Sequence, residues 1–164
     1  MSTDKLKNTI ADFKANLKGN TITIHSKEYA NVAFRVGILR KNLGTDATIK
    51  SELVFHDDKR VIVKSEIWID GKLISTGLAE ELRSSSRINQ LSALEVCESS
   101  SVGRAAAFLG LTNDNIASSQ EVSNAIVASD KKLIAALTEL GKVSHLGSYR
   151  SWLTANQKLM EEVK

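Results

Sequence analysis

The side chains that most often do catalytic chemistry or bind metals are scarce in this chain of 164 residues. Its three histidines, His25, His56 and His145, lie far apart in the sequence, and Cys97 is the single cysteine. These residues form no CxxC or HxxxH spacing of the kind that brings several ligands to one metal ion. We therefore expect neither a metal site nor a cofactor.

Motifs that bind nucleotides or activate a nucleophile are also missing. The sequence contains no GxxxxGK[ST] phosphate loop, no GxGxxG turn and no nucleophile elbow. Asp57 and Asp58 are neighbours that could bind a cation, but aspartate is more often a turn residue for its own backbone reasons. Glu52, Glu66 and Asp70 do not form a recognised nuclease spacing. We expect the protein not to be an enzyme; metal-dependent cleavage of a labelled strand would restore the nuclease hypothesis.

Basic residues are concentrated at the N-terminal end. The first 41 residues carry eight Lys and Arg against three Asp and Glu, whereas the whole chain has a formal charge of only +3. Such an excess suits an anionic partner, and it is also common on helices that are simply solvated. Two arginines, Arg83 and Arg87, lie among serines between residues 83 and 90, where a loop could contact phosphate or only be soluble.

The sequence also indicates where the protein works. One cysteine cannot form an internal disulfide, which fits a reducing compartment. No apolar run is long enough to cross a membrane, and the chain does not start with a signal peptide. We expect a soluble, cytoplasmic protein with no membrane partner.

Alternation of apolar and polar residues predicts an antiparallel meander of three strands near residues 47–56, 60–69 and 72–80. The apolar face is expected to hold Ile49, Ser51, Leu53 and Phe55 from the first strand, and Val61, Val63, Ile67 and Ile69 from the second. Asp70 and Gly71 form a pair that tolerates the positive φ angles of a type I′ hairpin turn.

Helical spacing of apolar residues predicts the remaining elements. Leu6, Ile10, Phe13 and Leu17 recur at helical spacing in a helix over residues 4–18, and a second helix, with a stripe from Val32 to Leu43, ends at Gly44. A long helix over residues 92–111 follows the meander, and its serine, glycine and alanine side chains leave room for a close neighbour. A sheet with one apolar face needs a cover, and this helix is the nearest candidate.

The predicted fold class is α+β, with a three-stranded antiparallel meander covered by a long helix and flanked by N-terminal and C-terminal helices. We expect one domain over residues 1–164, with a core over 21–127, the N-terminal helix over 4–18 and a helical extension over 128–164. Ser118 and Glu121 form a capping box that predicts a helix start in the last part of the core.

Three segments of this chain resemble a known family. The segment ALEVCESSSVGRAAAFLGL, followed by IASSQEVSNAI, resembles a pattern found in phage recombination proteins, and SKEYANVAFRVGILRKN looks like the upstream element of the same family. The order of helix, meander and long helix is similar to the core of the phage single-strand annealing proteins, the superfamily of the Erf and Red-beta recombinases. Ser26 departs from that pattern, because a glycine is frequent there, and so does the run Ser99 to Ser101.

The resemblance implies a protein that binds single-stranded DNA and anneals complementary strands without ATP in phage recombination. It implies a homo-oligomer, as a ring or filament, in the host bacterial cytoplasm, with a phage exonuclease or a host single-strand binding protein as a further partner. Matched by position, the DNA-binding residues would be Lys27, Arg35 and Arg104. Three outward residues of the meander form a second rank of DNA-binding candidates: Lys50, Arg60 and Lys64. Outward lysines on strands also serve simply to keep a sheet soluble and its edges unpaired.

Two other hypotheses stay open from the sequence. A protein that only coats single-stranded DNA for protection would look the same, and an annealing assay with two oligonucleotides separates it from an annealer. An oligomeric scaffold or interaction protein would use the small-residue helix and the helix around Trp152 as contacts. The scaffold hypothesis predicts no salt-sensitive binding to DNA.

Overall fold

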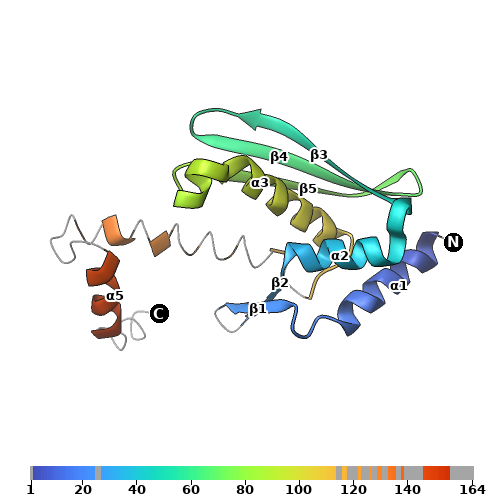
Figure 1. Cartoon of the computed structure of the whole chain (residues 1–164), viewed down its shortest axis with the longest axis horizontal. Helices are drawn as coiled ribbons and strands as arrows, with labels where there is room; N and C mark the ends of the chain where they lie inside the picture. Colours follow the sequence, from blue (N-terminus) through green and yellow to red (C-terminus); the bar gives the residue numbers. More distant parts are fainter. Residues whose placement is uncertain are drawn as a thin grey trace. The chain divides into compact units, whose positions relative to one another are not determined.

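The structure is a computed structural model, and it describes residues 2–24, 27–113, 116 and 117, eight positions from 122 to 138, and 146–155. The chain divides into two compact units, Met1–Asn124 and Ala125–Lys164. The second unit contains the described helix α5, Leu146–Ala155. The first unit holds the sheet and all the other described elements (Figure 1).

The first unit begins with a helix and a short hairpin and continues with a helix, three strands and a long helix. The N-terminal elements are α1 (Ser2–Ala15), β1 (Thr21–Ile24) and β2 (Lys27–Ala30). The elements that follow are α2 (Val32–Leu43), the 3₁₀ turn η1 (Gly44–Asp46), β3 (Ala47–His56), β4 (Arg60–Ile69), β5 (Lys72–Leu82) and α3 (Arg87–Phe108).

The predicted meander is confirmed. Strands β3, β4 and β5 form an antiparallel sheet in that order, and β4 alternates strictly, with Val61, Val63, Ile67 and Ile69 buried. The turn between β4 and β5 has positive φ at both Asp70, 50°, and Gly71, 74°, as a type I′ turn requires. These turn residues set the pairing beside the turn, where Ile69 pairs with Lys72. Further along, the ladder shifts between Ile67 and Trp68, so that Ile74 is an extra residue in β5.

The far end of β3 differs from the prediction. The pairing of β3 with β4 shifts between Leu53 and Phe55, so that Val54 is an extra residue in the ladder. Because of this shift Phe55 pairs with Ile62, on the face of the sheet that is not covered. Placing Phe55 on the face that α3 covers was therefore wrong, whereas Leu53, before the shift, pairs with buried Val63 and lies on the predicted face, although it is 46% exposed. Alternation predicts a face only while the ladder is unbroken.

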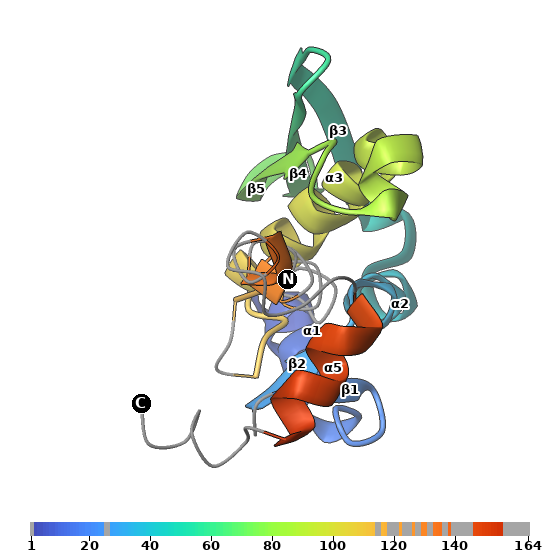
Figure 2. The same ribbon diagram turned by 90° about the vertical axis from the view of Figure 1, so that its left-hand side faces the viewer.

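Helix α3 covers one face of the sheet and comes unusually close to β5 (Figures 1 and 2). A Cβ atom added to Gly77 would lie 2.1 Å from the carbonyl oxygen of Ser101 and 2.4 Å from the amide nitrogen of Ala105. The Ser75 hydroxyl donates to the carbonyl oxygen of Ala105 at 2.9 Å, and the Ser65 and Ser101 hydroxyls are 2.5 Å apart. The small residues of α3 thus serve close packing on the sheet.

The start of α3 lies earlier than the sequence predicts. The polar stretch from residue 83 was expected to be a connection up to residue 90, but the helix begins at Arg87, after the cap Ser86, whose hydroxyl accepts from the Asn89 amide. Ser92 has non-helical angles, φ −138° and ψ 38°, which kinks the helix there. The long regular part therefore starts close to the predicted residue 92.

Helix α1 packs against α2 within the first unit (Figure 2). The rings of Phe13 and Phe34 have centroids 5.1 Å apart, and Phe13 is fully buried in the same core cluster as Leu39, Ile67 and Leu111. Burial of one such apolar side chain contributes about 1.5–3 kcal/mol. Gly44 ends α2 with positive φ, as predicted. The apolar stripe of α1 predicted from the sequence is therefore a core contact.

Several expectations fall on residues outside the described part of the chain. They include the capping box of Ser118 and Glu121, the departure at Ser26, and most of the extension over residues 128–164. The division into one domain with those inner bounds stays a prediction.

Candidate nucleic-acid interface

One end of the sheet brings together two segments that are distant in sequence. The amide nitrogen of Arg83 donates to the carbonyl oxygen of Lys59 at 2.8 Å, and its Nε donates to the carbonyl oxygen of Asp57 at 2.9 Å. The turn between β3 and β4 therefore lies beside the connection from β5 to α3. We call the four cations gathered here the sheet-end cluster: Lys59, Arg60, Arg83 and Arg87.

The sheet-end cluster also includes the N-terminus of α3. The amide of Asn89 is capped there by the Ser86 hydroxyl, and the positive end of the helix dipole favours negative charge nearby. Arg87 is exposed at the first position of that helix, and Lys59 is exposed in the turn. These residues could contact phosphate oxygens without reading a base.

Four acidic residues lie in the same segments and offset that charge: Asp57, Asp58, Glu80 and Glu81. Asp57 Oδ1 accepts from the amides of Lys59 and Arg60, at 2.8 and 2.7 Å, and these bonds hold the pKa of Asp57 below its usual value of 3.8. Glu80 pairs with Arg60 at 3.1 Å. The four cations and four carboxylates cancel, so a phosphate here would be contacted by individual Lys or Arg side chains and not attracted by a net positive charge.

The outward strand residues predicted as second-rank contacts are already engaged on the uncovered face of the sheet. Lys50 Nζ lies 4.9 Å from the centroid of the Trp68 ring. Lys64 Nζ is 2.6 Å from Glu66 Oε1, and this bond raises the pKa of Lys64 and lowers that of Glu66. Arg60 lies over the Phe55 ring at 5.4 Å in addition to its pair with Glu80. The face thus mixes opposite charges with aromatic rings.

Arg35 is a structural residue. Its side chain is fully buried, and Nη1 donates to the carbonyl oxygens of Gly103 and Ile116 at 2.8 and 3.1 Å, while Nη2 donates to that of Ala117 at 3.2 Å. It joins α2 to α3 and to the segment after α3. A phosphate cannot reach this guanidinium in the folded unit.

The other two first-rank residues lie on different elements. Lys27 is exposed at the start of β2. Arg104 lies on α3, partly buried, with Cζ 6.0 Å from the centroid of the Phe108 ring. The structure therefore does not gather Lys27, Arg35 and Arg104 into one surface. The sheet-end cluster could not be found from sequence spacing, because only the strand register places Lys59 beside Arg83.

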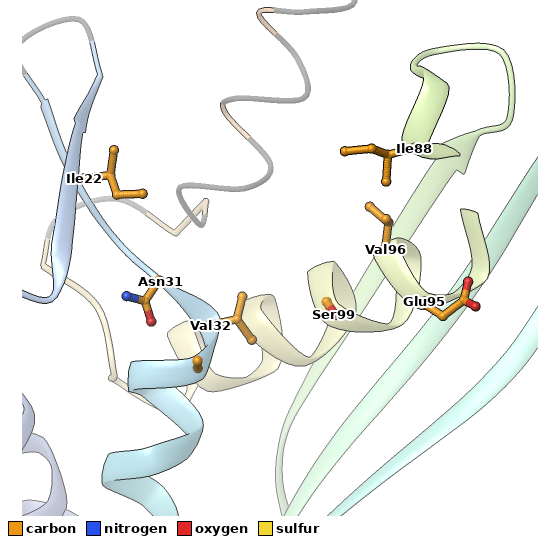
Figure 3. A pocket seen from close by; sticks show the side chains of 8 residues that line it. Ile22, Asn31, Val32, Ile88, Glu95, Val96 and Ser99 are labelled. Carbon is orange, nitrogen blue, oxygen red and sulfur yellow. The ribbon is translucent and has the colours of Figure 1, made fainter. Parts of the chain in front are cut away.

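A groove of about 480 Å³ lies between β1, the start of α2 and the outer side of α3 (Figure 3). Ile22, Val32, Ile88 and Val96 contribute apolar side chains to its wall. Among the described residues that line the groove, Glu95 is the one ionisable side chain. Within the described residues, no group of three or more His, Cys, Asp or Glu could hold a metal ion, and no helix could span a bilayer.

One family model matches part of the chain. The family is described as "Slr1353 N-terminal dsRNA-binding domain-like", and the match covers residues 38–109, which is 72 of the 164 residues. These residues run from the second half of α2 through the three strands to the end of α3. No curated protein and no solved structure matches the chain.

This match corrects the resemblance to the phage annealing proteins, which was wrong. The family found is of a different kind, and nothing supports single-stranded DNA annealing or coating, recombination, a phage origin, or a ring or filament. The expected partners, single-stranded DNA and other copies of the chain, are likewise unsupported, as are a phage exonuclease and a host single-strand binding protein. The physical reason is that a helix, a meander and a small-residue helix specify a fold, whereas the polymer bound depends on surface residues.

Proposed function

We propose that the first unit binds double-stranded RNA, and that it does so without catalysis. The observation that carries this proposal is the match of residues 38–109 to a family of dsRNA-binding-like domains, over the same residues that form half of α2, the sheet and α3. Such domains recognise the shape of the A-form duplex and its phosphates and 2′-hydroxyls across about 16 base pairs. We also propose a cytoplasmic location, because the single cysteine, Cys97, is a free thiol, and free thiols are typical of proteins in a reducing compartment.

The sheet-end cluster supports this proposal chemically. Lys59 and Arg87 are exposed and lie on two segments held together by the bonds of Arg83. Lys and Arg contacts to phosphate carry no sequence information, so binding should tolerate any duplex sequence and weaken steeply with salt. We expect the double variant Lys59→Ala/Arg87→Ala to bind less tightly, with a shallower dependence on salt.

The test is fluorescence anisotropy of the full chain with four labelled ligands of one sequence: duplex RNA of about 20 base pairs, duplex DNA, single-stranded RNA and single-stranded DNA. A fifth ligand, duplex RNA of about 8 base pairs, is half the length such a domain spans. The expected result is tightest binding to the longer RNA duplex and much weaker binding to the short one. Equal binding to single strands, or no binding at low salt, would overturn the proposal.

A further inference from the structure

The positive charge of the chain is concentrated outside the matched region. Residues 38–109 carry ten Lys and Arg and ten Asp and Glu, so their formal charge is zero. Residues 110–164 carry six of each sign, whereas residues 1–37 carry six basic and three acidic residues. The whole excess of +3 therefore lies before the match. Because duplex affinity depends strongly on the number of cations at phosphates, a neutral domain benefits from cations supplied by a neighbouring element.

Helix α1 presents such cations on its solvent side. Lys7 and Lys14 are exposed two helical turns apart, about 10 Å along the axis, and Lys18 is exposed just after the helix. Asn8, Ala11 and Ala15 lie on the same side, so no carboxylate stands between Lys7 and Lys14, and the one acid on this side, Asp4, is exposed one turn before Lys7. None of Lys7, Lys14 and Lys18 forms an ion pair within the part of the chain that the structure describes. We call these three residues the lysine row.

The acid in the middle of α1 is turned toward α2 and neutralised there. Asp12 Oδ2 accepts from Asn42 Nδ2 at 2.7 Å and lies 3.0 Å from Lys41 Nζ. The bonds from Asn42 and Lys41 hold the pKa of Asp12 below its usual value, so it stays ionised and paired. It therefore does not oppose the approach of a polyanion to the lysine row.

Helix α1 is also fixed to the rest of the unit. Lys5 pairs with Asp46 of η1, Asp12 is bonded to α2, and Phe13 packs on Phe34. A row of cations held in place loses less conformational freedom on binding than a flexible basic tail. The same packing argues against a membrane surface as the partner, because a helix that lies in a bilayer needs its apolar face for the lipid, and that of α1 is buried in the core.

We propose that the lysine row of α1 is a second phosphate-binding surface, which contacts the backbone of the RNA duplex held by the matched domain. This inference rests on the proposed function. A duplex with the charge density of B-DNA carries one phosphate per 1.7 Å, so about six phosphates lie within the 10 Å between Lys7 and Lys14. Lys7 and Lys14 can therefore each contact a phosphate of the same duplex.

The test compares the wild-type chain with Lys7→Gln/Lys14→Gln and with the charge-keeping control Lys7→Arg/Lys14→Arg. Both sites are exposed, so the urea midpoint and far-UV circular dichroism should stay as in wild type. Affinity for the RNA duplex of about 20 base pairs is measured from about 50 to 200 mM salt. Loss of two phosphate contacts should lower the slope of log K against log salt by about 1.8 and lower affinity at low salt at least about tenfold, while the Arg variant keeps the wild-type slope.

The outcomes separate this inference from the proposed function. If wild type binds the duplex and the Gln variant binds with the same affinity and slope, the lysine row is not a phosphate-binding surface, although the proposed function stands. If the Arg variant loses as much as the Gln variant, the effect is not one of charge and the inference is overturned. If the Gln variant loses only binding to phosphatidylserine vesicles, the row binds lipid instead. If wild type binds no duplex at low salt, both proposals fail.

Discussion

The contact between Gly77 and α3 gives the sharpest prediction about stability. In Gly77→Ala the new methyl group would lie 2.1 Å from the carbonyl oxygen of Ser101 and 2.4 Å from the amide nitrogen of Ala105. Both atoms are backbone, so no side chain can rotate away, and α3 must move off β5 by about 1 Å to reach ordinary van der Waals distances. The φ angle of Gly77 is not positive, so the cost is steric and not conformational.

The size of the effect follows from what the displacement breaks. Forcing one extra carbon into a packed interface costs about 1–3 kcal/mol. Two buried hydrogen bonds cross the same contact, from Ser75 to Ala105 at 2.9 Å and between Ser65 and Ser101 at 2.5 Å, and each contributes about 1 kcal/mol. We therefore expect Gly77→Ala to lower the free energy of unfolding by about 3–5 kcal/mol.

The matched control is the same substitution at Gly37, in the middle of α2. A Cβ atom there meets nothing within 4 Å, so Gly37→Ala should raise the free energy of unfolding by about 0.5–1 kcal/mol through helix propensity alone. The assay is urea unfolding followed by far-UV circular dichroism. A Gly77→Ala protein within about 1 kcal/mol of wild type would refute the close approach of α3 to β5, whatever Gly37→Ala does.

Two further predictions follow from single residues. Arg35→Lys should lower the free energy of unfolding by about 2–4 kcal/mol, because one ammonium group cannot replace a guanidinium that bonds three carbonyl oxygens on two segments. Urea unfolding measures this loss, and a variant as stable as wild type would show that these bonds are dispensable. Asp57→Ala should destabilise the turn between β3 and β4 at pH 7. Because folding lowers the pKa of Asp57, its contribution to the free energy of unfolding is present above the usual value of 3.8 and is lost as the pH falls through the lower folded pKa. The stabilities of wild type and variant should therefore become equal in acid. A difference in stability that persists below about pH 2 would contradict this role of Asp57.

Local patterns in the sequence determined most of the fold. Strict alternation in β4, the Asp70-Gly71 turn and the helical stripe of α1 each depend on residues close to one another in the sequence, so they could be recognised without a structure. The small residues of α3 likewise predicted a close neighbour, which proved to be β5 at Gly77. The identity of the polymer could not be obtained in this way, because the order of the elements does not encode surface chemistry.

The tertiary structure alone decided which charges share a surface. Arg35 and Lys7 are both basic residues of helices, yet one is buried among carbonyl oxygens and the other is exposed to solvent. Strand register places Lys59 beside Arg83, and the packing of α1 on α2 turns Asp12 inward while the lysine row stays outside. A charge acts through distance and exposure, and both are set by contacts between residues far apart in sequence. The sequence by itself therefore determined that the N-terminal end is basic, and the packing determined which of its cations can meet a phosphate.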